Sequence, residues 1–308
     1  MLGASALSKL TQNTALDFAL PIDPQSIELP LLDSWFTSTD AQERTAAEQV
    51  AQRISQRLVW LLTSLRESDT PWSTVRQFWL GGGIVSGQLG WRMAKAARNR
   101  LSDSVVYVAP HPNNLPLIGA LRYAASDTPH SLAIDLGGTA IKRGVGSFEE
   151  QRLRQINVLP TLTAPQLYYH QAVTIEQMQT LLDSIVDIVA ESWVLAQNRH
   201  EVSLSSRIPI SIASYIEGGR LTTPDTYGNL QGLAPDVFAL LSERLSERLG
   251  LAIDVELIHD GTAAAAALAG PPESGVIMMG TALGGSVSPD PAGLHSVNLD
   301  ALVMRGPH

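Results

Sequence analysis

The sequence has no cysteine, fewer basic than acidic residues and no long apolar run, and each shortage excludes a class of protein. Without cysteine the 308-residue chain has no disulfide, thiol nucleophile or cysteine-ligated zinc or iron–sulfur site. The 21 Lys and Arg against 30 Asp and Glu give a net charge of −9, which opposes nucleic-acid binding through phosphates. No apolar segment reaches the roughly 18 residues of a membrane span. The first residues also lack the long apolar region of a signal peptide. We therefore expect a cytoplasmic, two-domain protein with no nucleic-acid and no membrane partner.

Alternating helices and strands predict an α/β protein. Between Ala41 and Arg66 apolar residues recur at three- and four-residue steps, and Asp40 and Glu43 have the spacing of a capping box. The elements expected next are a strand at Phe78–Leu80, a helix ending near Arg100, a strand at Val105–Ala109 and a helix at Leu115–Ala124. This rhythm of strand, glycine turn, helix and strand is typical of α/β layers.

The second half repeats this rhythm after a polar linker at Ala125–His130. The expected elements are a strand at Ser131–Asp135 with a hairpin partner that contains Lys142, a helix at Thr174–Gln197, a strand at Arg207–Ser214, a helix at Asp236–Leu249, a strand at Leu251–Ile258, an alanine-rich helix, and a strand at Val276–Met279 followed by another strand. Pro235 at the first helical position and Gly250 after the last are the signals that bound the Asp236–Leu249 helix.

Three glycine turns, at Gly81–Gly83, Gly137–Thr139 and Gly280–Gly285, each follow an apolar strand. Glycine lets backbone amides approach an anion closely, and successive N–H groups in such turns form a concave site for phosphate. A single turn of this kind is a weak signal, and Gly81–Gly83 taken by itself is better interpreted as an ordinary strand exit. Asp135 makes the phosphate interpretation of the second turn more specific. A carboxylate beside a phosphate is energetically costly unless a divalent cation such as Mg²⁺ lies between them. The alternative is that Asp135 caps the turn.

Asp260 is the candidate general base. It follows an apolar strand and precedes the alanine-rich helix, where a carboxylate can accept a proton from a substrate hydroxyl. An N-cap of that helix is an equally good interpretation of its position. The run Ala263–Ala267 predicts close helix packing.

Taken together, these segments resemble the ROK sugar kinases of the actin-like ATPase superfamily. Ser131–Gly144 (SLAIDLGGTAIKRG) resembles the first phosphate motif, Tyr227–Leu268 the segment that ends in the catalytic motif, and Met279–Val287 (MGTALGGSV) the second phosphate motif. Phe78–Gly87 (FWLGGGIVSG) resembles the adenosine motif, and Asn114–Ala120 the closing helix. The resemblance covers most of the chain. It implies two ribonuclease H-like α/β domains around a cleft.

The order of these motifs is circularly permuted relative to the family. The adenosine motif comes first here, and moving residues 1–130 behind His308 restores the family order. We expect a smaller domain at 131–261 and a larger one that combines 1–124 with 262–308. Chain termini lie at domain surfaces and often near one another, so such a rearrangement is physically tolerable.

The resemblance assigns a role to each motif residue. It implies that Asp135 positions Mg²⁺, that Asp260 is the general base and that Asn229 and His259 hold the acceptor. The residues implied in ATP binding are Asp135, Gly137, Gly138, Thr139, Gly280, Thr281, Gly284, Gly285, Gly82 and Gly83. The implied activity is ATP- and Mg²⁺-dependent phosphoryl transfer to a sugar hydroxyl, as in a glucokinase-like hexose kinase. The sequence leaves open whether the protein forms a homodimer.

Several positions depart from the family pattern. His259 replaces the usual Asn before the catalytic Asp, and Ser214-Tyr215 replaces a Pro-Gly. The sugar-reading Glu-x-x-His motif and the cysteine-containing zinc motif are absent. We therefore keep two alternatives: a nucleotide- or sugar-binding regulator with weak or no catalysis, and a kinase for a non-sugar hydroxyl such as pantothenate. A structural member of the fold is a third, suggested by the divergent first 40 residues.

Other residues receive plainer interpretations. We expect Trp60, Trp79 and Trp91 in the core or at domain contacts, and His295 in a solvated loop. The basic run Arg92, Lys95, Arg98 and Arg100 is expected to form a solvated helix face. Lys142 and Arg143 are interpreted either as phosphate-attracting groups or as ordinary exposed residues at a strand end.

Overall fold

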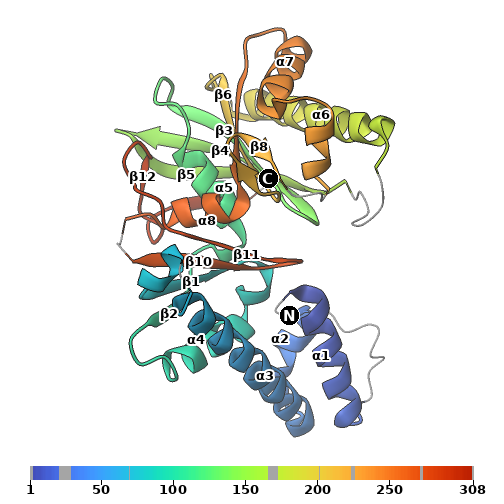
Figure 1. Ribbon diagram of the computed structural model, residues 1–308, viewed down its shortest axis with the longest axis vertical. Helices are drawn as coiled ribbons and strands as arrows, with labels where there is room; N and C mark the ends of the chain where they lie inside the picture. Colours follow the sequence, from blue (N-terminus) through green and yellow to red (C-terminus); the bar gives the residue numbers. More distant parts are fainter. Residues whose placement is uncertain are drawn as a thin grey trace. The chain divides into compact units, whose positions relative to one another are not determined.

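The fold comes from a computed structural model, which describes residues 3–20, 29–68, 70–165, 173–200, 202–222, 226–270 and 273–306. The chain divides into two compact units (Figure 1). Unit 1 comprises Met1–Leu115 and Gly270–Ser288, and unit 2 comprises Pro116–Ala269 and Pro289–His308. No helix in the described ranges combines the length and the apolar character that crossing a membrane requires.

Unit 2 is built on a mixed sheet. Its strands are β3 (His130–Leu136), β4 (Ala140–Glu149), β5 (Arg152–Thr163), β6 (Arg207–Ile212), β9 (Asp254–His259), β12 (Ser296–Val297) and β13 (Val303–Arg305). β3, β4 and β5 form an antiparallel meander, and β6 and β9 continue it in parallel with β3. The sheet order is β12-β5-β4-β3-β6-β9, and β13 also pairs with β5. A separate hairpin joins β7 (Ile216–Glu217) to β8 (Arg220–Leu221).

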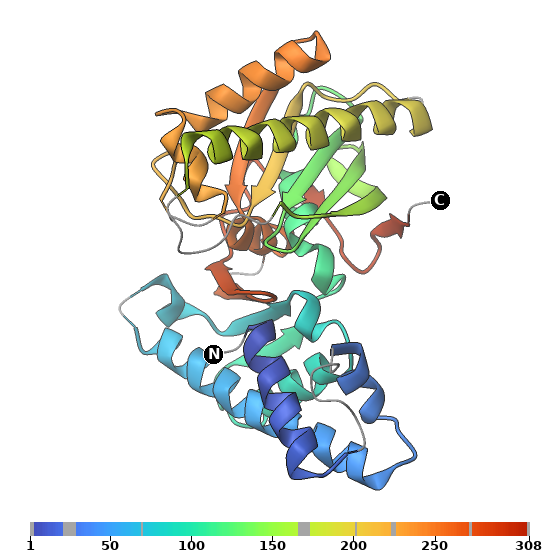
Figure 2. The ribbon, with the colours of Figure 1, turned by 90° about the vertical axis from the view of Figure 1, so that its right-hand side faces the viewer.

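Helices cover both faces of this sheet. The helices of unit 2 are α5 (Leu115–Arg122), α6 (Ile175–His200), α7 (Val237–Leu249), α8 (Asp260–Ala267) and the short 3-10 helix η5 (Gly228–Gly232). α6 and α7 lie on one face (Figure 2). α5 packs against the other, where a Cβ at Gly144 or Gly146 would meet the side chains of Leu117 or Leu121. Strands buried on both faces have continuous apolar sequences, which explains the apolar run Leu132–Ile134.

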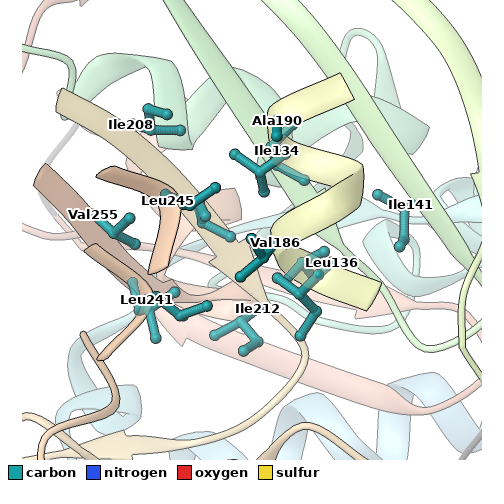
Figure 3. Close-up of a cluster of buried hydrophobic side chains, with 14 of the residues drawn as sticks. Ile134, Leu136, Ile141, Val186, Ala190, Ile208, Ile212, Leu241, Leu245 and Val255 are labelled. Atoms are coloured by element: carbon teal, nitrogen blue, oxygen red, sulfur yellow. The ribbon is translucent and has the colours of Figure 1, made fainter. Parts of the chain in front are cut away.

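The core of unit 2 lies between the sheet and helices α6 and α7. Figure 3 shows this cluster, which includes Ile134 and Leu136 from β3, Ile208 and Ile212 from β6, Val255 from β9, Val186 and Ala190 from α6, and Leu241 and Leu245 from α7. Full burial of a Leu or Ile side chain stabilises the fold by roughly 1.5–3 kcal/mol. This core therefore holds the carboxyl ends of β3, β6 and β9 in fixed positions.

On the opposite face, α5 and α8 approach each other unusually closely. A Cβ on Gly119 of α5 would lie 1.6 Å from the carbonyl oxygen of Ala263 in α8. Ala263–Ala267 are all buried, which confirms the predicted close packing of the alanine run. Arg122, only 3% exposed, donates to the carbonyl of Ala266 in the last turn of α8 and to that of Ala269 just after the helix. α8 is thus held at its middle and at its end.

Unit 1 contains a second, four-stranded sheet of order β11-β10-β1-β2. Its strands are β1 (Gln77–Gly81), β2 (Val105–Val108), β10 (Ser274–Met279) and β11 (Leu283–Val287). Its helices are α1 (Ala4–Asp17), α2 (Leu29–Trp35), α3 (Ala41–Arg66) and α4 (Gln88–Arg98), with short 3-10 helices η2 (Pro71–Thr74), η3 (Gly83–Val85) and η4 (Pro112–Asn114). The α3 prediction is confirmed, and the carboxylate of Asp40 accepts the N–H of Gln42 at 2.7 Å.

The two sheets share a four-strand pattern. In unit 2, the antiparallel hairpin β3–β4 is followed across the sheet by the parallel strands β6 and β9. In unit 1, the antiparallel hairpin β10–β11 is followed by the parallel strands β1 and β2. The difference is chain order, since β1 and β2 precede β10 and β11 in the sequence. Unit 1 therefore combines strands from both ends of the chain.

The unit boundaries differ from the sequence expectation. The division falls after Leu115, Ala269 and Ser288 instead of near Ala124 and Gly261, because α5 and α8 pack with unit 2. One helix start also differs. Asp236 is the N-cap of α7, accepting the N–H of Ala239 at 2.9 Å, so Pro235 precedes the cap instead of occupying the first helical position.

Three interpretations of single residues were wrong. Trp60 and Trp91 are 71% and 50% exposed, so neither belongs to the core. His295 is 5% exposed rather than solvated, and its ring nitrogens face the carbonyls of Ala124 and Gln151. Arg143 is buried and donates to Pro160 O and Ser192 Oγ, so it is no exposed strand end. Each error arose because burial depends on distant segments.

Candidate functional site

The polar residues of unit 2 gather where three neighbouring parallel strands end. Leu136, Ile212 and His259 lie side by side in the register of β3, β6 and β9. The residues that follow them are the turn Gly137–Thr139, the loop through Tyr215, and Asp260. Ligands of α/β sheets bind outside the carboxyl ends of parallel strands, so this edge is the candidate site.

Asp135 is the most buried acid of this edge, with 2% exposure. Its register partners are Lys142 on β4 and Ser211 on β6. The Ser211 hydroxyl donates to Oδ1 at 3.0 Å, and the Lys142 ammonium lies 3.4 Å from Oδ2. These contacts are with neighbouring strands, not with the turn that Asp135 was alternatively expected to cap. Sequence reasoning missed Ser211, whose signal is one hydroxyl within the apolar strand RIPISI.

The glycine turn Gly137–Thr139 joins β3 to β4, as the sequence predicted. Gly138 and Thr139 are exposed at its tip. A Cβ at Gly137 would lie 2.8 Å from Ala140 O, so the turn has little room for a side chain there. The hydroxyl of Tyr227 donates to Gly137 O at 3.0 Å. Tyr227 precedes η5, which carries the half-buried Asn229, and thereby ties that segment to the turn.

Asp260 is the first residue of α8. The N-cap is His259, so the interpretation of Asp260 as N-cap was wrong. Its Oδ1 accepts the N–H of Gly261 at 2.6 Å, and His259 Nε2 lies 3.2 Å from the same oxygen. A carboxylate in the first turn of a helix is favoured by the macrodipole, which stabilises its ionised form.

His259 lies between β9 and α8 with 13% of its side chain exposed. The ring of Tyr215 stacks on the imidazole with centroids 4.6 Å apart and planes 17° from parallel. Nδ1 lies 3.4 Å from the hydroxyl of Thr262. Burial lowers the pKa of His259, because a charged imidazolium would lose hydration there. The ring is therefore neutral at neutral pH. Sequence reasoning noted Tyr215 only as a departure from the family pattern.

The remaining predicted residues lie in unit 1. Gly82 has a φ of +92°, and a Cβ on it would lie 2.4 Å from Met279 O, so only glycine fits this position. Gly82 and Gly83 thus lie beside the start of the turn at Gly280 and Thr281, which joins β10 to β11. Gly284 and Gly285 lie in β11, paired with Met278 and Ile277. The two segments that resemble the adenosine and second phosphate motifs are therefore neighbours within unit 1.

The residues of unit 2 fit a magnesium ion that binds together with a nucleotide. Among the described residues, no group of three or more His, Asp or Glu side chains could hold a metal ion. Mg²⁺ needs no such cage, since one or two carboxylates together with substrate phosphates suffice. Asp135 supplies one buried carboxylate beside a glycine turn. Its two observed contacts leave further lone-pair sites on the carboxylate, which has about four.

The comparisons with known proteins are weak. No protein-family model and no curated protein matches the sequence. Among solved structures, a polyphosphate/ATP-glucomannokinase from Arthrobacter sp. strain KM is 21% identical at a TM-score of 0.34, over 51% of this chain and 56% of that one. The match thus spans little more than half of the glucomannokinase. An exopolyphosphatase-like protein is 15% identical at a TM-score of 0.28, over 77% of this chain and 87% of that one. At these TM-scores the functional assignment rests on the chain's own residues.

Proposed function

We propose that this protein is an ATP-dependent kinase that phosphorylates a hydroxyl of a sugar or related polyol. The observation that carries the proposal is the edge of β3, β6 and β9. It combines the buried carboxylate of Asp135, which lies 3.4 Å from the ammonium of Lys142, with the glycine turn Gly137–Thr139. A second carboxylate, that of Asp260, lies at the start of α8. Phosphoryl transfer requires positioning, cationic groups near the phosphates and a base for the attacking hydroxyl.

The shared strand pattern of the two sheets supports a permuted actin-like ATPase fold. Each sheet has a hairpin whose turn carries glycine and threonine, followed by two parallel strands. In unit 2 these strands follow chain order, whereas in unit 1 the two parallel strands come from the N-terminal end. This arrangement is expected for a circular permutation of an ancestral chain with two similar halves. The old termini would be joined, and the new termini would lie within the second half.

The proposal gives each of these residues a role. Asp260 accepts the proton of the acceptor hydroxyl as the hydroxyl oxygen attacks the γ-phosphorus, and the bond to the β–γ bridging oxygen breaks to release ADP. Lys142 and the turn Gly137–Thr139 bind phosphate oxygens, and Asn229 hydrogen-bonds the acceptor. Five glycines and one threonine of unit 1 contact the remaining phosphates and adenosine. They are Gly82, Gly83, Gly280, Thr281, Gly284 and Gly285. Mg²⁺ would neutralise phosphate charge, and Asp135 would hold the ion or its waters.

The experiment is a screen for ATP consumption with hexoses, pentitols, amino sugars, glycerol and pantothenate, for the wild type and Asp260→Asn. We expect turnover with a sugar or polyol and a loss of about 10²- to 10⁴-fold in Asp260→Asn. The dissociation constant of ATP, measured by calorimetry, should change by less than about threefold, which corresponds to less than about 1 kcal/mol. Asp254→Asn is the matched control, because the Asp254 side chain is 72% exposed and lies at the start of β9, the strand that ends just before Asp260.

Four outcomes would contradict the proposal or part of it. Unchanged turnover in Asp260→Asn would remove Asp260 as the base. ATP binding without turnover for any acceptor would indicate a nucleotide-binding regulator. No nucleotide binding would indicate a structural or partner-binding member of the fold, and turnover with pantothenate alone would reassign the acceptor.

A further inference from the structure

Three side chains lie in a row at the ends of β6 and β9: Tyr215, His259 and Asp260. We propose that His259 is a positioning residue for Asp260, holding its carboxylate through an Nε2–H donor, and that Tyr215 holds the imidazole in place. This inference rests on the proposed function, since it states how the proposed base is oriented. It differs from the family-derived expectation that His259 binds the acceptor.

Two close contacts indicate which ring nitrogen carries the proton. Nε2 lies 3.2 Å from Asp260 Oδ1, and an ionised carboxylate can only accept. A bare lone pair on Nε2 would be repelled by this oxygen, so the contact favours a proton on Nε2. A neutral imidazole has one N–H, so Nδ1 is the acceptor, and the Thr262 hydroxyl at 3.4 Å can donate to it. Both ring nitrogens thus have partners on α8.

Tyr215 restricts the remaining freedom of the ring. Its side chain stacks on the imidazole face at 4.6 Å and 17°. A ring flip of His259 would exchange the donor with the acceptor, and it would have to break this stack together with the contacts to Asp260 and Thr262. Tyr215 is 55% exposed while the His259 side chain is 13% exposed, so the tyrosine covers the histidine from the solvent side.

The arrangement also determines the charge on the base. A neutral imidazole donates a hydrogen bond and leaves Asp260 fully negative. An imidazolium would form an ion pair with Asp260 and weaken it as a base. The titratable groups in contact with the ring are Asp260 on α8 and Tyr215 after β6. The transfer rate should therefore fall in acid as His259 becomes protonated.

The test compares His259→Phe with His259→Gln. Phe keeps a ring for Tyr215 and removes the donor, whereas the Gln amide can place an N–H near the position of Nε2. A hydrogen bond to a charged group contributes a substantial free energy, and His259→Phe removes the donor to Asp260. We therefore expect kcat to fall about 10- to 100-fold in His259→Phe, with the acceptor KM unchanged. His259→Gln should recover most of kcat and flatten the acid limb of the pH–rate profile.

Variants at other positions provide controls. Tyr215→Leu should lower kcat about 2- to 10-fold and Tyr215→Phe should retain it, because the stack needs a ring and not the hydroxyl. His130→Gln, at the opposite end of β3, should match the wild type. Circular dichroism of each variant separates a loss of folding from a loss of rate.

The result that overturns the proposal is a raised acceptor KM with an unchanged kcat in His259→Phe, which would assign His259 to acceptor binding. Nitrogen-15 NMR gives a second readout, with the His259 signals identified by their absence in His259→Gln. An Nε2–H tautomer at pH 7.5 is expected, and an Nδ1–H tautomer or a charged ring would also overturn the proposal. If the wild type phosphorylates no acceptor, the proposed function itself fails. A positioning failure instead leaves an active wild type and an inactive Asp260→Asn.

Discussion

The contact between α5 and α8 can be tested with one methyl group, by the substitution Gly119→Ala. The added Cβ would lie 1.6 Å from Ala263 O and 2.5 Å from Ala263 C, whereas ordinary contact begins at 3.4 Å. The shortfall of about 1.8 Å is against backbone, which cannot rotate away as a side chain would. The two helices must therefore separate or one of them must tilt.

The cost can be placed within limits. Overpacking a tight core contact costs typically about 1–3 kcal/mol and here should reach the upper end or exceed it. The better helix propensity of Ala offsets about 1 kcal/mol. A net loss of about 2–3 kcal/mol should lower the melting temperature of unit 2 by roughly 5–10 °C. Because Asp260 is the first residue of α8, the transfer rate should fall as well.

The assay is thermal unfolding by circular dichroism and calorimetry, with ATP consumption measured in parallel. Gly306→Ala is the matched control, since a Cβ there has nothing within 4 Å. A melting temperature within about 1 °C of the wild type, well below the shift estimated above, would refute the close packing of α5 on α8.

Further predictions concern a buried cation, a backbone turn and a titrating ring. Arg122→Met should lower the free energy of unfolding by about 2–4 kcal/mol in urea titrations, because the carbonyls of Ala266, Ala269 and His295 lose their donor; an unchanged midpoint would contradict this. Gly82→Ala should cost at least about 2 kcal/mol by the same measurement, since φ is +92° and the Cβ meets Met279 O. His259 has a lowered pKa, so below pH 6.5 the unfolded chain binds a proton that the folded chain does not. The free energy of unfolding should therefore fall as pH drops through this window, and its difference from His259→Gln should become independent of pH above the window; a difference that is also constant within the window would argue against burial as the cause.

Local signals predicted much of the secondary structure. Asp40 and Arg66 bound α3 because caps and three- to four-residue periodicity act within a few residues of each other. Gly250 ends α7 with a φ of 68°, as a C′ glycine should. The hairpin turns at Gly137 and Gly280 follow from the same local chemistry. Pro235 misled the prediction by one residue, because Asp236 provides a better cap.

Residue identity also indicated the candidate carboxylates, but not their partners. Asp135 and Asp260 stood out by position alone, at the ends of apolar strands. The Ser211 hydroxyl on Asp135 depends on the register of β6 against β3, 76 residues apart in sequence. The stack of Tyr215 on His259 likewise depends on β6 and β9 being neighbours. No local pattern encodes either contact.

The sequence by itself thus determined elements such as α3, the positions of the glycine turns and the exclusion of cysteine chemistry, but it did not indicate α1, α2 or β5. These features depend on backbone propensities and caps that act over at most a few residues. The tertiary structure alone decided that α5 and α8 belong with the sheet of unit 2, that Trp60 is exposed and His295 buried, and that His259 contacts Asp260 beneath Tyr215. Such features depend on which distant strands pair and which faces they bury, and that is set by the packing of the whole core.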